Sequence, residues 1–96
     1  MSTKNDLALP SIHVNGTSKD ELVRQLSEAH LRLQQAREAL MQAAPHQRDY
    51  YVQKDQGNYY RARKQYEARL LKIEEVMSEL LDLGILIQDG GHKAEE

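Results

Sequence analysis

Tyrosine and basic side chains gather in one window of the chain, and together they could bind a phosphate-bearing molecule. All five tyrosines of the 96-residue chain fall between residues 50 and 66. Residues 46–72 carry seven basic and three acidic side chains, whereas residues 73–96 carry one basic and seven acidic side chains. Guanidinium groups form paired hydrogen bonds with phosphate oxygens, and tyrosine rings stack on nucleobases. We therefore take this window as the candidate site.

The order of charges along the window opposes the preference of a helix for its own stability. Arg61, Arg63 and Lys64 fall in the first turns of a predicted helix, and the acidic residues follow later, between positions 74 and 82. The helix dipole favours the reverse order, with acids at the N-terminus and bases at the C-terminus. A helix N-terminus that also carries guanidinium groups suits an anionic ligand. The charge order thus favours a binding role for this segment.

Specific roles follow for the residues of the window. We expect Arg48 and Arg61 to contact phosphate, and Tyr50 or Tyr51 to stack on the base of a nucleotide-like ligand. Arginine and tyrosine are also enriched at protein interfaces, so the same cluster could be a contact surface for another protein. Both interpretations stay open from the residues alone.

The first predicted helix runs over residues 18–44. Ser18 and Glu21 have the spacing of a capping box, and Pro45 cannot continue the hydrogen-bond ladder. Its apolar residues follow a 4-3 heptad spacing with Leu at one seam position and mostly Ala at the other: Leu22, Leu26, Ala29, Leu33, Ala36, Leu40 and Ala43. Such a narrow seam is typical of a helix that packs closely on one neighbour.

A second helix of similar length is predicted over residues 58–88, after a polar connection at 45–57. The expected fold is all-α, an antiparallel two-helix hairpin (17–89) resembling a coiled coil, with an extended N-terminal arm at 1–16 and a disordered tail at 90–96. Six apolar residues cover more than one face near the end of the second helix: Leu80, Leu81, Leu83, Ile85, Leu86 and Ile87. They indicate assembly into a helical-bundle homo-oligomer, or cover by the arm.

Composition argues against several other classes of protein. The chain has no Cys, and its four histidines lack the i,i+3 or i,i+4 spacing of helical metal ligands, so we expect neither an enzyme, nor a metal site, nor a cofactor. No run of about 18 apolar residues could span a membrane, and we expect a cytoplasmic protein. A formal net charge of -2 and an acidic far end argue against nucleic acid as the partner.

Two short segments resemble a group of small phage and prophage proteins without an assigned function. They are Ile-His-Val-Asn-Gly-Thr-Ser at 12–18 and Ala-Pro-His-Gln-Arg-Asp-Tyr-Tyr at 44–51, within a resemblance that spans about residues 12–88. The resemblance implies a helical hairpin from a phage-type source, acting in the host cytoplasm. It draws attention to six residues: Asn15, Thr17, Arg48, Asp49, Tyr50 and Tyr51. It implies no activity.

Two functions are therefore expected as alternatives. The first is sequestration of a small phosphate-bearing ligand, a host immune nucleotide signal, at the Tyr/Arg cluster. Asn15 or Thr17 would complete that pocket from a neighbouring hairpin, because a hairpin about 40 Å long keeps them far from the cluster of their own chain. The second is a helical-hairpin adaptor or structural protein that binds a host or virion protein through the same surface.

Overall fold

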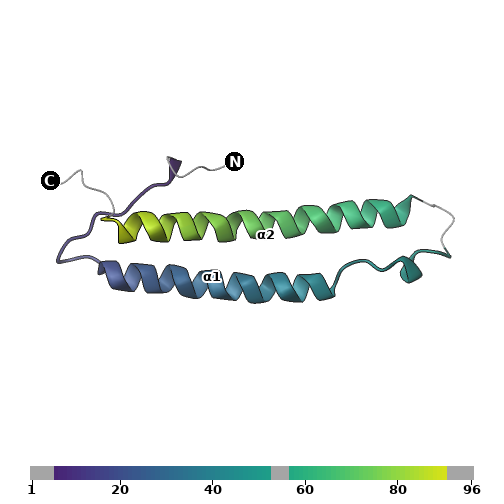
Figure 1. The fold of residues 1–96 in the computed structure, drawn as a ribbon, viewed down its shortest axis with the longest axis horizontal. Helices are drawn as coiled ribbons and strands as arrows, with labels where there is room; N and C mark the ends of the chain where they lie inside the picture. The colour runs from purple at the N-terminus through teal and green to yellow at the C-terminus, as the bar shows by residue number, and fades with distance from the viewer. Residues whose placement is uncertain (1–5, 53–56, 91–96) are drawn as a thin grey trace.

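The computed structural model describes residues 6–52 and 57–90, and in them the chain forms two long helices and a short helical turn after the first of them. Helix α1 is Lys19–Gln42, η2 is a short 3-10 turn at Gln47–Asp49, and helix α2 is Asn58–Gln88. The two long helices pack side by side and antiparallel along their lengths (Figure 1). The described residues contain no β-strand. The all-α hairpin expected from the sequence is thus confirmed, and the tail at 91–96 lies outside the described residues.

Local signals set the ends of α1. Ser18 Oγ accepts a hydrogen bond from the Glu21 backbone N–H at 3.1 Å, which makes Ser18 the N-cap. Only this hydrogen bond of the expected capping box is formed. The Glu21 carboxylate, which would accept from the Ser18 backbone N–H, accepts instead from Arg24, at 3.0 and 2.6 Å, and from Gln25 at 2.9 Å. Glu21 thus takes the place that the spacing suggested for Asp20 as the partner of Arg24. The helix ends at Gln42, two residues earlier than predicted.

The contact face of α1 differs from the predicted Leu/Ala seam. Leu26, Leu33 and Leu40 are half-buried as expected, but Ala29, Ala36 and Ala43 are exposed. The second seam position is occupied by Val23, His30 and Arg37, all half-buried. The seam therefore includes His30 and Arg37 beside the apolar residues, and the stem of Arg37 packs between the helices while its guanidinium pairs with Glu74.

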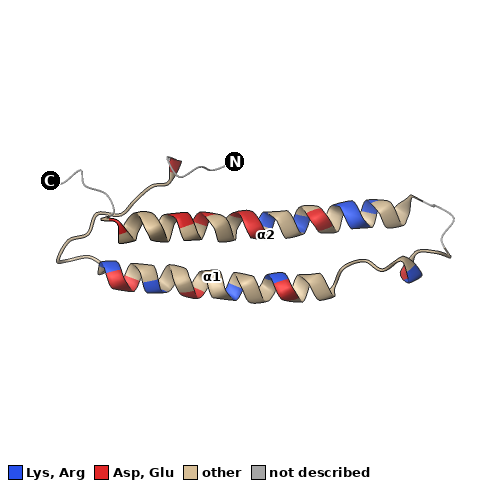
Figure 2. Cartoon of the chain, in the orientation of Figure 1, with Lys and Arg blue, Asp and Glu red and all other residues tan. Residues whose placement is uncertain are grey.

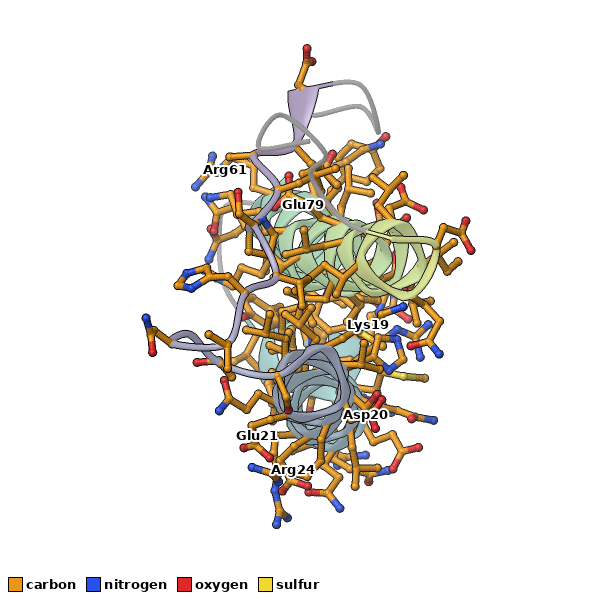
Figure 3. The ribbon with its side chains drawn as sticks, turned by 90° about the vertical axis from the view of Figure 1, so that its left-hand side faces the viewer. Lys19, Asp20, Glu21, Arg24, Arg61 and Glu79 are labelled. Atoms are coloured by element: carbon orange, nitrogen blue, oxygen red, sulfur yellow. The ribbon has the colours of Figure 1, made fainter. Side chains whose placement is uncertain are left out.

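One ion pair among the described residues joins the last third of α1 to the middle of α2. Arg37 Nε donates to Glu74 Oε2 at 2.8 Å, and Arg37 Nη2 lies 2.8 Å from the same oxygen. At the end of the hairpin where both termini lie, Lys19 Nζ donates to the backbone carbonyl of Gln88 at 3.4 Å. A cation at a helix C-terminus complements the helix dipole. Figure 3 shows Lys19 between the helices at this end, while Asp20, Glu21 and Arg24 lie on the outer side of α1.

The N-terminal arm crosses the end of α2. From Ser18 it runs back past the C-terminal end of α2 in both views (Figures 1 and 3), and Leu7, Leu9 and Ile12 in it are half-buried. On α2, Ile87 is only 2% exposed and Leu86 is half-buried, whereas Leu81 and Ile85 stay half exposed. The broad apolar surface predicted here is therefore shared between α1, the arm and solvent.

The hairpin buries little of its surface. Ile87 and Tyr66, at 7% exposure, are the only buried apolar side chains among the described residues. The radius of gyration is 19.3 Å, against about 12.5 Å for a compact chain of this length. The accessible surface is 7306 Å², against about 5,650 Å² for a compact monomer of 11.1 kDa. One neighbouring helix is not enough to cover either α1 or α2.

Candidate ligand site at the helical connection

The first part of the segment between the helices, residues 43–52, forms a hydrogen-bonded turn. Pro45 follows the last turn of α1, and the His46 side chain then caps η2, with Nδ1 accepting from the Arg48 backbone N–H at 3.0 Å. Backbone bonds from Asp49 N–H to the His46 carbonyl and from Tyr50 N–H to the Gln47 carbonyl, both 3.0 Å, close the turn. These three bonds fix the backbone from which Arg48 projects.

A pocket of about 510 Å³ lies between this turn, the end of α1 and the first turns of α2. Its lining residues are Met41, Gln42, Ala44, Pro45, His46, Gln47, Arg48, Tyr59 and Arg63. The volume falls within the range of about 300 to 1,000 Å³ that is usual for small-molecule sites. Its two guanidinium groups come from separate elements, and the described residues that line it include no carboxylate.

The tyrosines of the window pack against each other and against cations. The rings of Tyr50 and Tyr59 lie 5.7 Å apart at an interplanar angle of 54°. The Arg63 guanidinium lies 5.2 Å from the ring centre of Tyr66, and Lys64 Nζ lies 5.4 Å from that of Tyr60. Tyr59 is the tyrosine that lines the pocket. Tyr50 and Tyr66 lie outside the lining and contact two of its residues, Tyr59 and Arg63.

The electrostatic setting of the pocket is basic. Blue segments gather at the connection end of α2 and red segments at the other end (Figure 2). The first turn of α2 contains no acidic residue, and its N-cap, Gly57, has no side chain to accept a hydrogen bond. Arg63 has one carboxylate nearby, Glu67, whose Oε2 is 3.7 Å from Nη2. Because that contact is long, it holds Arg63 only weakly.

The structure separates the predicted site residues into three groups. Arg48 lines the pocket. Tyr50, Tyr51 and Arg61 lie at the same end of the hairpin outside the pocket lining, and Arg61 Nη2 donates to Asn58 Oδ1 at 2.8 Å. Asn15 and Thr17 are exposed at the opposite end, next to the start of α1.

Three pocket residues were not predicted from the sequence: His46, Tyr59 and Arg63. Tyr59 and Arg63 are four residues apart on α2 and therefore project from the same side of the helix, which is the signal that could have paired them. Arg61 is rotated away from that side by half a turn. His46 follows Pro45 at the position of a turn cap, where a ring nitrogen can accept a backbone N–H.

Other kinds of site are not formed by the described residues. They contain no group of three or more His, Asp or Glu side chains placed to hold a metal ion. Neither α1 nor α2 has the length of apolar sequence that a membrane-spanning helix needs, within the part of the chain described.

No family model, curated protein or solved structure matches this chain in sequence or in fold. The geometry of the hairpin and of its pocket is therefore the basis for a functional proposal.

Proposed function

We propose that this chain is a non-enzymatic binding protein that holds a small phosphate-bearing molecule in the pocket at the helical connection. The observation that carries the proposal is the convergence of Arg48, from η2, and Arg63, from α2, on one pocket of about 510 Å³. Two guanidinium groups held by separate elements can grip a phosphate from two directions. The pocket is large enough for the rest of a nucleotide as well.

The other pocket residues suit a nucleotide better than a bare anion. Tyr59 presents an aromatic ring beside Arg63, and Met41 and Pro45 add apolar surface on which a base can pack. The imidazole of His46 uses Nδ1 to cap η2, so its part in the pocket is structural. Binding without turnover is proposed because the described lining residues offer cations, an aromatic ring and apolar surface, which hold a ligand.

A second candidate function is supported by the exposed residues beside the pocket. Tyr51 is 73% exposed and Val52 is 75% exposed, and Tyr60 is largely exposed as well. Aromatic and apolar side chains that project together from one end of a rod are typical of a protein-contact site. The adaptor function is thus the rival proposal for the same end of the hairpin.

Calorimetry with a defined panel separates the two functions. We would titrate the full chain with cyclic mononucleotides, cyclic dinucleotides, ADP-ribose and inorganic phosphate; the resemblance to phage proteins is the reason to include the cyclic nucleotides. If one nucleotide binds the unaltered chain, and its binding free energy is weaker by about 1.5 to 3 kcal/mol in Arg48→Gln, the result supports ligand binding at this pocket.

The matched control is Arg32→Gln, which removes an exposed arginine on α1 that is paired with Glu28 at 2.8 Å. The affinity of Arg32→Gln for the nucleotide should equal that of the unaltered chain. Absence of heat with every compound, or equal losses in both variants, would contradict ligand binding at this pocket. Capture of a protein partner that depends on Tyr51 and Tyr60 would then favour the adaptor function.

A further inference from the structure

An apolar groove of about 330 Å³ lies between α1 and α2 near the end that carries the termini. Val23 and Leu26 line it from α1, and Leu80, Leu81, Gly84 and Ile85 line it from α2. A side-chain carbon placed on Gly84 would meet nothing within 4 Å, so the groove is open at that point. A glycine inside a helix is less stable than alanine, and here it leaves room for a partner side chain.

The groove and the basic pocket lie on the same long side of the hairpin. Arg63, in the pocket, and Leu81, in the groove, are 18 residues apart on α2, which is five whole helical turns. Met41, in the pocket, and His30, in the groove, are 11 residues apart on α1, which is close to three turns. One face of the molecule therefore has an apolar hollow at one end and guanidinium groups at the other.

The charge on α2 changes sign at the middle of the helix. Residues 58–72 carry five basic side chains and one acidic one, and residues 73–88 carry four acidic side chains and no basic one. Figure 2 shows this division along the ribbon. Helix α1 has four charges of each sign and does not compensate for it. Arg37 with Glu74 is the one ion pair between α1 and α2 that the described residues form.

A second copy of the same chain can cover the apolar groove and also complement the charge division of α2. If it lies antiparallel, about a two-fold axis that passes residue 73 at the middle of α2, Lys64 of each copy, one position from Arg63, comes opposite Asp82 of the other copy, one position from Leu81. A parallel arrangement would set like charges against each other. The two-fold axis also brings the first turns of α2 of each copy, with the exposed side chain of Tyr60, onto the groove of the other.

The size of the face is sufficient for a stable dimer. The hairpin measures 65 Å by 22 Å in its two longest dimensions, so one long side spans about 1,430 Å². A standard protein interface buries about 800 Å² per partner, a little over half of that face. The hairpin also exposes about 1,650 Å² more surface than a compact monomer of its mass.

We propose that a second copy of this chain docks antiparallel on the face formed by the apolar groove and the basic pocket. Each copy then places the first turns of its α2 over the groove of the other, and the assembly is a four-helix arrangement with complementary charges. This dimer does not depend on any small ligand, so its test is independent of the proposed function.

Sedimentation of the full chain over 1 to 200 μM tests the docking face. Ile85→Arg should weaken self-association at least tenfold, because it sets a cation in the groove against the basic end of the partner. The matched control is Val76→Arg: Val76 is also β-branched, is 45% exposed against 49% for Ile85, and lies nine residues earlier, on the opposite side of α2. Far-UV circular dichroism should be the same for both variants.

The orientation is tested by a spin label on a single cysteine, since the chain has no cysteine of its own. A label at Asp89→Cys, 16 residues from the middle of α2, should give a separation of about 48 Å in the antiparallel dimer. A separation of about 20 Å or less would show parallel packing and overturn the proposal. A monomer at 200 μM, or equal weakening by Ile85→Arg and Val76→Arg, would also overturn it.

Discussion

At the scale of single residues, the contrast between Arg61 and Arg63 carries most of the functional proposal. Both are early in α2, but Arg63 lines the pocket while the Arg61 guanidinium donates to Asn58 Oδ1. The direction of each side chain depends on the rotation of α2 about its axis relative to the connection. Tyr50 contacts Tyr59 between the connection and α2, and no sequence spacing reveals that contact.

Substitution of these two arginines should therefore have unequal effects on ligand affinity. Arg63→Gln should weaken nucleotide binding by about 1.5 to 3 kcal/mol, because it removes a charge-assisted hydrogen bond to phosphate. Arg61→Gln should change it by less than about 0.5 kcal/mol, as is usual for an exposed substitution away from a site. Calorimetry with the same nucleotide measures both, and a larger loss for Arg61→Gln would point to the site originally expected from the sequence.

Glu21 provides a pH-dependent prediction at the start of α1. Hydrogen bonds from Arg24 and then Gln25 lower the pKa of the Glu21 carboxyl to about 2. Because folding lowers this pKa, the stabilising contribution is full above the unfolded value of about 4.3 and is lost as the pH falls through that value toward 2. Carbon-detected NMR titration should show the low midpoint in the unaltered chain, and Arg24→Gln should raise it. A midpoint near 4 in the unaltered chain would mean that this hydrogen-bonded pair does not persist in solution.

At the scale of elements, the sequence predicted the helices better than the faces they present. The bounds of α2 are those expected, and α1 differs by one residue at its start and two at its end, because Ser18 and Pro45 act locally. The predicted seam was partly wrong because the leucines at 26, 33 and 40 can form a heptad repeat with either of two sets of residues. One set is the alanines, and the other is Val23, His30 and Arg37. The alanine side looked more apolar, whereas the structure uses the side where Arg37 reaches Glu74.

The corrected seam predicts unequal costs for changes on the two sides of α1. Leu33→Ala should destabilise the fold by about 1 to 3 kcal/mol, less than for a fully buried leucine, because Leu33 is half-buried between the helices. Ala36→Leu should change the stability by no more than about 0.5 kcal/mol, because Ala36 is exposed. Urea denaturation of both variants measures this difference. A decrease of more than 1 kcal/mol in the free energy of unfolding for Ala36→Leu would show that Ala36 lies in the contact face, as the sequence predicted.

At the scale of the whole molecule, the hairpin is a rod with a small core and opposite charges at its two ends. The sequence predicted the shortage of core, since 40% hydrophobic residues in a chain of 96 leave little to bury. It could not show that Leu86 is half-buried while Ile85 stays half exposed, near the end of α2 that the arm runs past, because that depends on the path of residues 6–18. The exposed side is where we place the second copy.

Self-association of such a rod should make its thermal stability depend on concentration. If dimer formation adds stability to the folded state, the midpoint of unfolding should rise as the protein concentration rises from 2 to 200 μM. The rise should be smaller in 0.5 M salt than in 0.05 M salt, because salt screens the charges of the two halves of α2. Calorimetric scans measure both effects. A midpoint independent of concentration at both salt levels would indicate a monomer.

The central claim is that the pocket between η2 and α2 binds a phosphate-bearing ligand, and amide NMR tests it most directly. The ligand is the tightest binder of the nucleotide panel, with inorganic phosphate as the minimal probe. We predict shifts confined to the amides of residues 41–48 and 59–63, together with the side-chain Nε–H signals of Arg48 and Arg63. No amide shift with any compound would contradict the claim. Shifts centred on the other end of the hairpin, where α1 begins and α2 ends, would also contradict it.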